Sequence, residues 1–186
     1  MTRTLKAFLI TAAILVPGAA QAGWQDHATA YDQSRLARLD EARSQAMAEA
    51  GGAAQEALNA PATGGSITGN WRCRTVKLGG MTQSMTYSWF RCRVFHYNGA
   101  LRFEKMNGTQ RMAGTLYPEG NGYVYIGASW VKGEHPHRYS GNGASVGAQA
   151  TPDDQIGRMT ATSNGARLEM PYPVQESMMD VVELRR

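Results

Sequence analysis

The sequence predicts a mainly β protein, in which a short helical arm at the N-terminus precedes an antiparallel up-and-down β-barrel of about eight to nine strands. Two observations predict this fold. The composition changes near residues 61–65, from a stretch rich in Ala, Gln, Glu and Arg to one rich in Gly, Tyr, Val and Thr. Beyond that point Asn-Gly pairs, which are the strongest short-range hairpin signal, recur between short alternating runs, at Asn98-Gly99, Asn107-Gly108 and Asn164-Gly165.

Residues 1–22 have the organisation of a cleavable secretory signal peptide. Arg3 and Lys6 precede an apolar run over residues 7–16, and a small-residue cleavage site ends at Ala22. The run has about half the length that a membrane-spanning helix requires, and no Cys follows the cleavage site to accept a lipid. We therefore expect export to the periplasm, with no transmembrane segment after cleavage.

Residues 23–60 form the expected helical arm, residues 61–66 a linker, and residues 67–186 the barrel domain. Asp32 stands where an N-cap would begin a helix, and apolar residues from Leu36 onward follow helical spacing. A Gly-Gly pair at positions 51–52 interrupts this helix, and a second short helix is expected over residues 53–59. The apolar stripe is thin and mostly alanine, so we expect a solvated arm that rests on the β-domain. A dedicated partner-binding helix is the alternative.

The expected strands follow the turn signals, near residues 68–77, 86–97, 100–106, 109–117, 123–131, 145–150, 156–163, 166–171 and 180–185. Two-residue Asn-Gly turns would place Val94 opposite Phe103, and Phe103 opposite Met112. One face of this three-stranded meander is then core, formed by Val94, Leu101, Phe103, Met112 and Leu116. The other face, which carries Arg93, Glu104 and Arg111, is exposed to solvent.

The chain has two cysteines, Cys73 and Cys92, each near the middle of an expected strand. An exported protein with an even, low number of cysteines normally oxidises them. We expect a disulfide between directly opposed residues, worth about 3 kcal/mol through its restraint of the unfolded chain. A redox-active pair is the alternative, but the chain has no Cys-x-x-Cys motif.

This register would gather four guanidinium groups on one outer face, with Arg72 opposite Arg93 and Arg74 opposite Arg91. Like charges across a ladder are destabilising, and Glu104 is the nearest expected counter-ion. The common interpretation is a solvated face whose Arg stems cover aromatic rings. The alternative is an anion-binding face for an acidic partner, a phospholipid headgroup or a glycan.

No catalytic, metal or cofactor motif rises above chance, and we expect no cofactor. His135 and His137 are the weak metal candidates, because His-x-His on an extended segment places both rings on one face, but zinc needs further ligands. The chain has 19 basic and 15 acidic residues, and two basic residues lie in the signal peptide, so the net charge falls from +4 to +2. A nucleic-acid partner is therefore not expected.

Several stretches resemble the domain-of-unknown-function family 4893, a set of exported proteins of Gram-negative bacteria with no assigned activity: Trp71-Arg72-Cys73-Arg74-Thr75, Tyr87-Ser88-Trp89-Phe90-Arg91-Cys92-Arg93, Gly114-Thr115-Leu116-Tyr117 and Pro171-Tyr172-Pro173. The resemblance covers nearly the whole mature chain, supports the fold and compartment, and implies no active site.

The opening Gly69-Asn70-Trp71 and the closing Arg185 or Arg186 also resemble lipocalin-like barrels, in which a terminal Arg packs on the first Trp.

These observations favour a non-enzymatic periplasmic binding or envelope-associated module, whose barrel interior or Arg face engages an unidentified small ligand, lipid or envelope protein. The alternative is an inhibitor or regulator of an envelope hydrolase that acts through a protein interface. The location of any cavity in the barrel distinguishes a ligand-binding interior from the Arg face.

Overall fold

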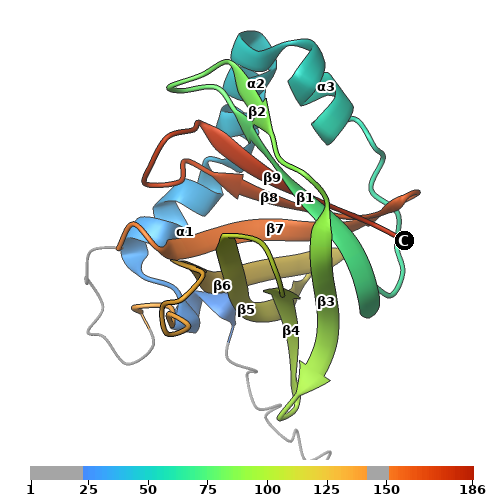
Figure 1. The fold of residues 1–186 in the computed structure, drawn as a ribbon, viewed down its shortest axis with the longest axis vertical. Helices are drawn as coiled ribbons and strands as arrows, with labels where there is room; N and C mark the ends of the chain where they lie inside the picture. The colour runs from blue at the N-terminus through green and yellow to red at the C-terminus, as the bar shows by residue number, and fades with distance from the viewer. Residues whose placement is uncertain (1–22, 142–150) are drawn as a thin grey trace, which may run out of the picture.

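The computed structural model describes residues 23–141 and 151–186, and within them the β-domain is a closed antiparallel barrel of eight strands with one extra strand (Figure 1). Each barrel strand pairs with the next barrel strand in the chain, and the last strand closes the barrel on the first over residues 72–78. The extra strand, β2, pairs with the end of β1. The strands are β1 (Gly69–Leu78), β2 (Ser84–Thr86), β3 (Phe90–Tyr97), β4 (Ala100–Lys105), β5 (Gln110–Glu119), β6 (Gly122–Val131), β7 (Asp154–Thr162), β8 (Gly165–Pro171) and β9 (Met179–Arg185). The predicted barrel is confirmed.

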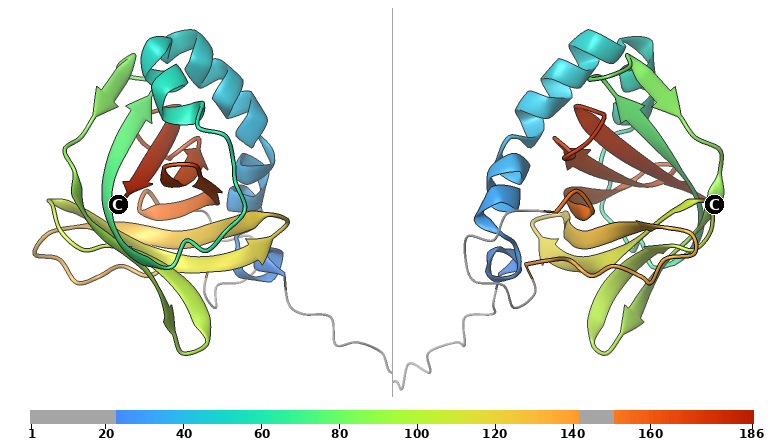
Figure 2. Two further views of the ribbon diagram at one scale, coloured as in Figure 1. Left: turned by 90° about the vertical axis from the view of Figure 1, so that its right-hand side faces the viewer. Right: turned by 60° about the vertical axis from the view of Figure 1, so that its left-hand side comes forward.

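Three helices run along the outside of the barrel, over β7, β8, β9 and β1 (Figure 2). Thr29, and not Asp32 as predicted, is the N-cap of the first helix, because its hydroxyl accepts a hydrogen bond from the Asp32 N–H at 3.2 Å. Gly51, with φ of +52°, separates the second helix from the third, as the Gly-Gly pair predicted. The helices are α1 (Ala30–Ala37), α2 (Leu39–Ala50) and α3 (Gly52–Leu58), after a single 3-10 turn at Trp24–His27.

The arm is less solvated than the sequence suggested. Ala42, Ala46 and Ala54 of α2 and α3 are fully buried, and they pack with Leu58 against outward-facing side chains of β1 and β9. Alanine allows the helix backbone to approach the sheet closely, so a thin apolar stripe still forms a second core. The arm is therefore packed on the barrel wall through its small side chains.

Inward-facing side chains fill most of the barrel. Phe103 and Tyr125, both fully buried, meet edge to face with ring centroids 5.9 Å apart. Gly127 makes room for this arrangement, because a Cβ there would lie 2.4 Å from the Tyr125 hydroxyl oxygen. The predicted core face of the meander is confirmed, and Leu101 packs at its edge. The rest of this core includes Trp71, Cys73, Cys92, Val94, Met112, Leu116, Met159, Leu168, Val182 and Leu184.

Two predicted registers were wrong by two residues. Val94 does face Phe103 as predicted. Phe103, however, faces Gly114 and not Met112, because the connection from β4 to β5 takes the four residues 106–109 instead of a two-residue turn. A shift of two residues keeps every side chain on its face. Met112 therefore still points inward.

The Cys73–Cys92 disulfide is present, but it joins diagonal neighbours. Trp71 faces Cys92 and Cys73 faces Phe90 across β1 and β3, and the two cysteine Cα atoms are 5.8 Å apart. The same shift changes the arginine pairs, so that Arg72 and Arg91 are opposite each other.

The remaining expectations concern the strands and the chain ends. The expected strand over residues 86–97 is divided into β2 and β3, and the expected strand over residues 145–150 and the signal peptide lie outside the described residues. Among the helices of the described residues, none has the length and apolar character needed to cross a membrane.

Candidate binding cavity

A cavity of about 200 Å³ lies at one end of the barrel, where β1, β4, β6 and β8 end and β5, β7 and β9 begin. The other end is filled by the apolar core around Phe103 and Tyr125. Inward positions change from apolar to polar toward the cavity, which is lined by Thr75, Lys77, Lys105, Ser129, Gln155 and Asp180. The barrel therefore has a closed apolar interior and a polar mouth.

Lys105 is the unusual residue of this cavity. It continues the inward-facing row of Leu101 and Phe103 on β4, it is only 5% exposed, and its Nζ lies 4.4 Å from the centroid of the Phe90 ring. Among the described residues, its ammonium has no carboxylate or hydrogen-bond partner. Burial lowers the pKa of Lys105 to about 8. A buried amine without a counter-ion is costly, so this position is poised to accept an anionic partner.

The other lysine of the cavity is paired. Lys77 on β1 lies directly opposite Asp180 on β9, and its Nζ bonds to the Glu176 carboxylate. Partial burial lowers the pKa of Lys77, but Asp180 and Glu176 outweigh it, so the pKa lies above its ordinary value. Burial raises the pKa of Asp180, which also accepts a hydrogen bond from the Ser177 hydroxyl at 2.5 Å. These charges largely satisfy one another.

Arg111 also borders the cavity at the start of β5, but its side chain lies on the outer face of the barrel. It alternates with the inward-facing Met112 and lies directly opposite Trp130 on β6, whereas Met112 lies opposite Lys105. Its Nε is buried without a hydrogen-bond partner among the described residues. Lys105 is therefore the cation that points into the cavity without a partner in the part of the chain that the structure describes.

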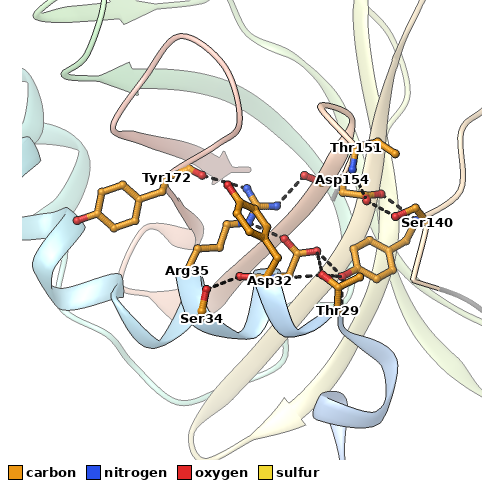
Figure 3. Close-up of polar contacts among 10 residues, drawn as sticks. Thr29, Asp32, Ser34, Arg35, Ser140, Thr151, Asp154 and Tyr172 are labelled. Carbon is orange, nitrogen blue, oxygen red and sulfur yellow. Dashed lines mark hydrogen bonds and ion pairs between the residues drawn. The ribbon is translucent and has the colours of Figure 1, made fainter. Parts of the chain in front are cut away.

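Arg35 of α1, in the helical arm, also lines the cavity. Figure 3 shows its contacts with the neighbouring residues of the arm and the barrel. Its guanidinium lies 2.6 Å from the buried Asp32 carboxylate and donates to the Tyr172 and Asp154 carbonyl oxygens at 3.1 and 2.8 Å. Asp32 also accepts a hydrogen bond from the Tyr139 hydroxyl. Burial, together with that bond, raises the pKa of Tyr139. This network fixes α1 beside the cavity. Its two charged groups, Arg35 and Asp32, pair with each other.

The predicted Arg face is partly neutralised. Arg74 bonds to the carboxylates of Glu183 and Glu56, and Arg93 lies 2.6 Å from Glu104. Arg72 and Arg74 lie over the Trp89 ring, at 5.7 and 4.9 Å from its centroid, and Arg93 lies over Phe95 at 4.2 Å. Arg91 is exposed. Three of the four arginines thus cover aromatic rings on the outside of the barrel, away from the cavity.

The other predicted features are also located. Arg186 lies over the Trp71 ring at 5.0 Å, the contact that the lipocalin-like resemblance implied. His137 lies 3.0 Å from Asp153 and 4.0 Å from Glu134, whereas His135 has no such partner among the described residues. Within residues 23–141 and 151–186, no group of three or more His, Cys, Asp or Glu side chains is arranged to hold a metal.

Sequence reasoning did not single out Lys105, although the signal was present. The first hairpin places Leu101 and Phe103 on the core face, and the period of two puts Lys105 on the same face. A lysine at an inward position of a barrel strand was therefore visible before its neighbours were known.

A family model described as Domain of unknown function (DUF4893) matches residues 24–184. Neither the curated proteins nor the solved structures that were searched contain a match to the chain.

Proposed function

The chain belongs to the family described as Domain of unknown function (DUF4893), and from that premise we propose that it is a non-enzymatic binding module whose barrel cavity takes up a small anionic molecule, such as a carboxylate. The observation that carries the proposal is Lys105, whose buried amine lines the cavity and has no counter-ion among the residues that the structure describes. A bound carboxylate would supply the missing partner through a charge-assisted hydrogen bond.

The size and lining of the cavity support a small ligand. Its volume of about 200 Å³ is below the ~300–1,000 Å³ of pockets that hold drug-sized molecules. Met112 and Met170 supply apolar surface, and Thr75, Ser129 and Gln155 supply neutral hydrogen-bonding groups. These groups suit a compact molecule with one anionic end and a short apolar body.

Isothermal titration calorimetry with benzoate, acetate and inorganic phosphate tests this function, and benzyl alcohol serves as the uncharged analogue of benzoate. We expect saturable binding of at least one anion and no binding of benzyl alcohol. Lys105→Met, which keeps the length of the side chain but removes its charge, should weaken anion binding at least tenfold.

Lys132→Met is the matched control, since Lys132 is exposed and lies outside the cavity lining. This variant should bind like the wild type. Equal affinity in the wild type and Lys105→Met, or no binding of any of the three anions at millimolar concentration, would overturn the proposal.

We also propose that residues 1–22 direct export, which the disulfide supports because such bonds persist in oxidising compartments. Expression of the full-length chain in a Gram-negative host, followed by fractionation and intact mass measurement, should yield a periplasmic form that begins at Gly23. Retention of an uncleaved chain in the cytoplasm would contradict it.

A further inference from the structure

We propose that Lys105 captures its ligand covalently, by forming an imine with the carbonyl group of an aldehyde or an α-oxo acid that enters the barrel cavity. This inference rests on the proposed binding function and adds to it the chemical class of the ligand. An α-oxo acid fits this cavity, because its carbonyl carbon suits the Lys105 amine and its carboxylate suits the neutral hydrogen-bonding groups of Thr75, Ser129 and Gln155 in the lining.

The geometry separates Lys105 from the other lysines of the described residues. The Lys105 amine lies at the boundary between the apolar core and the cavity, over the Phe90 ring and without a carboxylate partner among the described residues. Lys77 is held as an ammonium by Glu176 and Asp180, and Lys132 is exposed to water. Desolvation of a lysine in an apolar pocket is a recognised way to activate it as a nucleophile.

The protonation of Lys105 supports the same assignment. Burial brings its pKa to about 8, so an appreciable fraction of the amine is neutral near pH 7.5. The other charged residues around the cavity are Arg35 of α1, Lys77 of β1, Arg111 of β5, Asp153 and Asp154 next to the start of β7, Glu176 in the β8–β9 connection and Asp180 of β9, and β6 and β8 contribute none. Arg35 and Lys77 have carboxylate partners, and the Arg111 side chain lies on the outer face of β5.

The reaction balances without an oxidant or a reductant. The nitrogen lone pair of Lys105 attacks the carbonyl carbon and forms a C–N bond, and a proton passes from nitrogen to the former carbonyl oxygen. The carbinolamine then loses its hydroxyl group and the second nitrogen proton as one water molecule, which leaves a C=N bond. Hydrolysis reverses these steps, so capture is reversible.

Reductive trapping tests the proposal. The wild type is incubated with glyoxylate and sodium cyanoborohydride, and peptide mass mapping then locates carboxymethyl groups on lysines and on the N-terminus. We expect Lys105 to be modified at least tenfold faster than Lys132, with a rate that rises from pH 6 to pH 9. An excess of benzoate should protect Lys105 and leave Lys132 unaffected, and urea-unfolded protein should lose the selectivity.

The outcomes separate this inference from the binding function. Benzoate binding without selective trapping of Lys105 would overturn imine formation and leave the binding function standing. Selective trapping that benzoate does not prevent, in a protein that binds none of the test anions, would overturn the carboxylate ligand and retain the reactive lysine. Equal trapping of Lys105 and Lys132 in the folded protein would contradict the proposal. The Lys105→Met variant is the control that shows how much adduct forms at other sites.

Discussion

The Lys105 amine lies 4.4 Å from the centroid of the Phe90 ring, inside a barrel whose neighbouring inward positions are apolar. A cation over an aromatic face gains a modest attraction. That attraction does not replace the hydration that the amine loses, since Lys105 is 5% exposed and its pKa falls to about 8. The protein therefore retains a destabilising group at the cavity, as functional sites commonly do.

Lys105→Met should stabilise the fold at pH 7, because it replaces a buried charge that has no partner within residues 23–141 and 151–186 with an apolar side chain of similar length. Urea unfolding followed by circular dichroism should show a higher midpoint for this variant than for the wild type. Lys132→Met should leave the midpoint unchanged. A lower midpoint for Lys105→Met would show that the amine has a stabilising partner.

The same residue predicts a pH dependence. The folded-state pKa of about 8 lies below the ordinary value of ~10.4, so the unfolded chain binds more protons between these values, and the free energy of unfolding rises with pH. Between pH 8 and 9.5 the wild type should gain about 1.5 kcal/mol relative to Lys105→Met. Parallel curves for the two proteins would contradict a lowered pKa.

Asp32→Asn should destabilise the protein by about 3–5 kcal/mol, because it leaves the buried Arg35 guanidinium without its carboxylate. Urea unfolding measures the effect. Arg91→Met, which changes an exposed arginine, is the control and should have little effect. A small loss in Asp32→Asn would show that the Tyr172 and Asp154 carbonyl groups suffice for Arg35.

Gly127→Ala tests how tightly the closed end of the barrel is packed. The added methyl group would lie 2.3 Å from the Ala113 carbonyl oxygen and 2.4 Å from the Tyr125 hydroxyl oxygen. Such overpacking costs about 1–3 kcal/mol. Gly64→Ala is the control, because a Cβ at Gly64 would meet no neighbouring atom, and it should not lower the melting temperature. Gly99 is less suitable as a control because its φ of +79° would strain an alanine.

The disulfide should stabilise the protein by about 3 kcal/mol, since it closes a loop between residues 19 apart in the chain. The double variant Cys73→Ala with Cys92→Ala should lower the free energy of unfolding by at least that amount. Unchanged stability in the double variant would contradict a structural role.

The sequence predicted the barrel because the Asn-Gly turns and the period-two patterns are local signals. It also predicted which residues face the core, since a two-residue register error preserves the face. The four-residue connection before β5 was not visible, because Asn107-Gly108 also fits a two-residue turn. The packing of α2 was missed because alanine at a helix–sheet contact has no distinctive pattern.

The candidate site was only partly predictable. The alternation of side chains along β4 predicts that Lys105 points into the barrel. Whether a carboxylate lies near its amine depends on strands that are far away in the sequence. The Arg35 network likewise joins α1 to residues more than 100 positions away. Such contacts arise from the closure of the barrel and the docking of the arm, and no local sequence motif predicts them.

A pH titration by NMR measures directly whether the Lys105 amine is buried without a partner. The chain has four lysines, at positions 6, 77, 105 and 132, so a protein labelled with ¹³Cε-lysine gives few signals, and Lys105→Met assigns the one that matters. We predict a midpoint of about 8 for Lys105 in the free protein, and an upward shift when benzoate binds beside the amine. A midpoint near the ordinary value of ~10.4 that benzoate leaves unchanged would contradict an unpaired, anion-accepting Lys105.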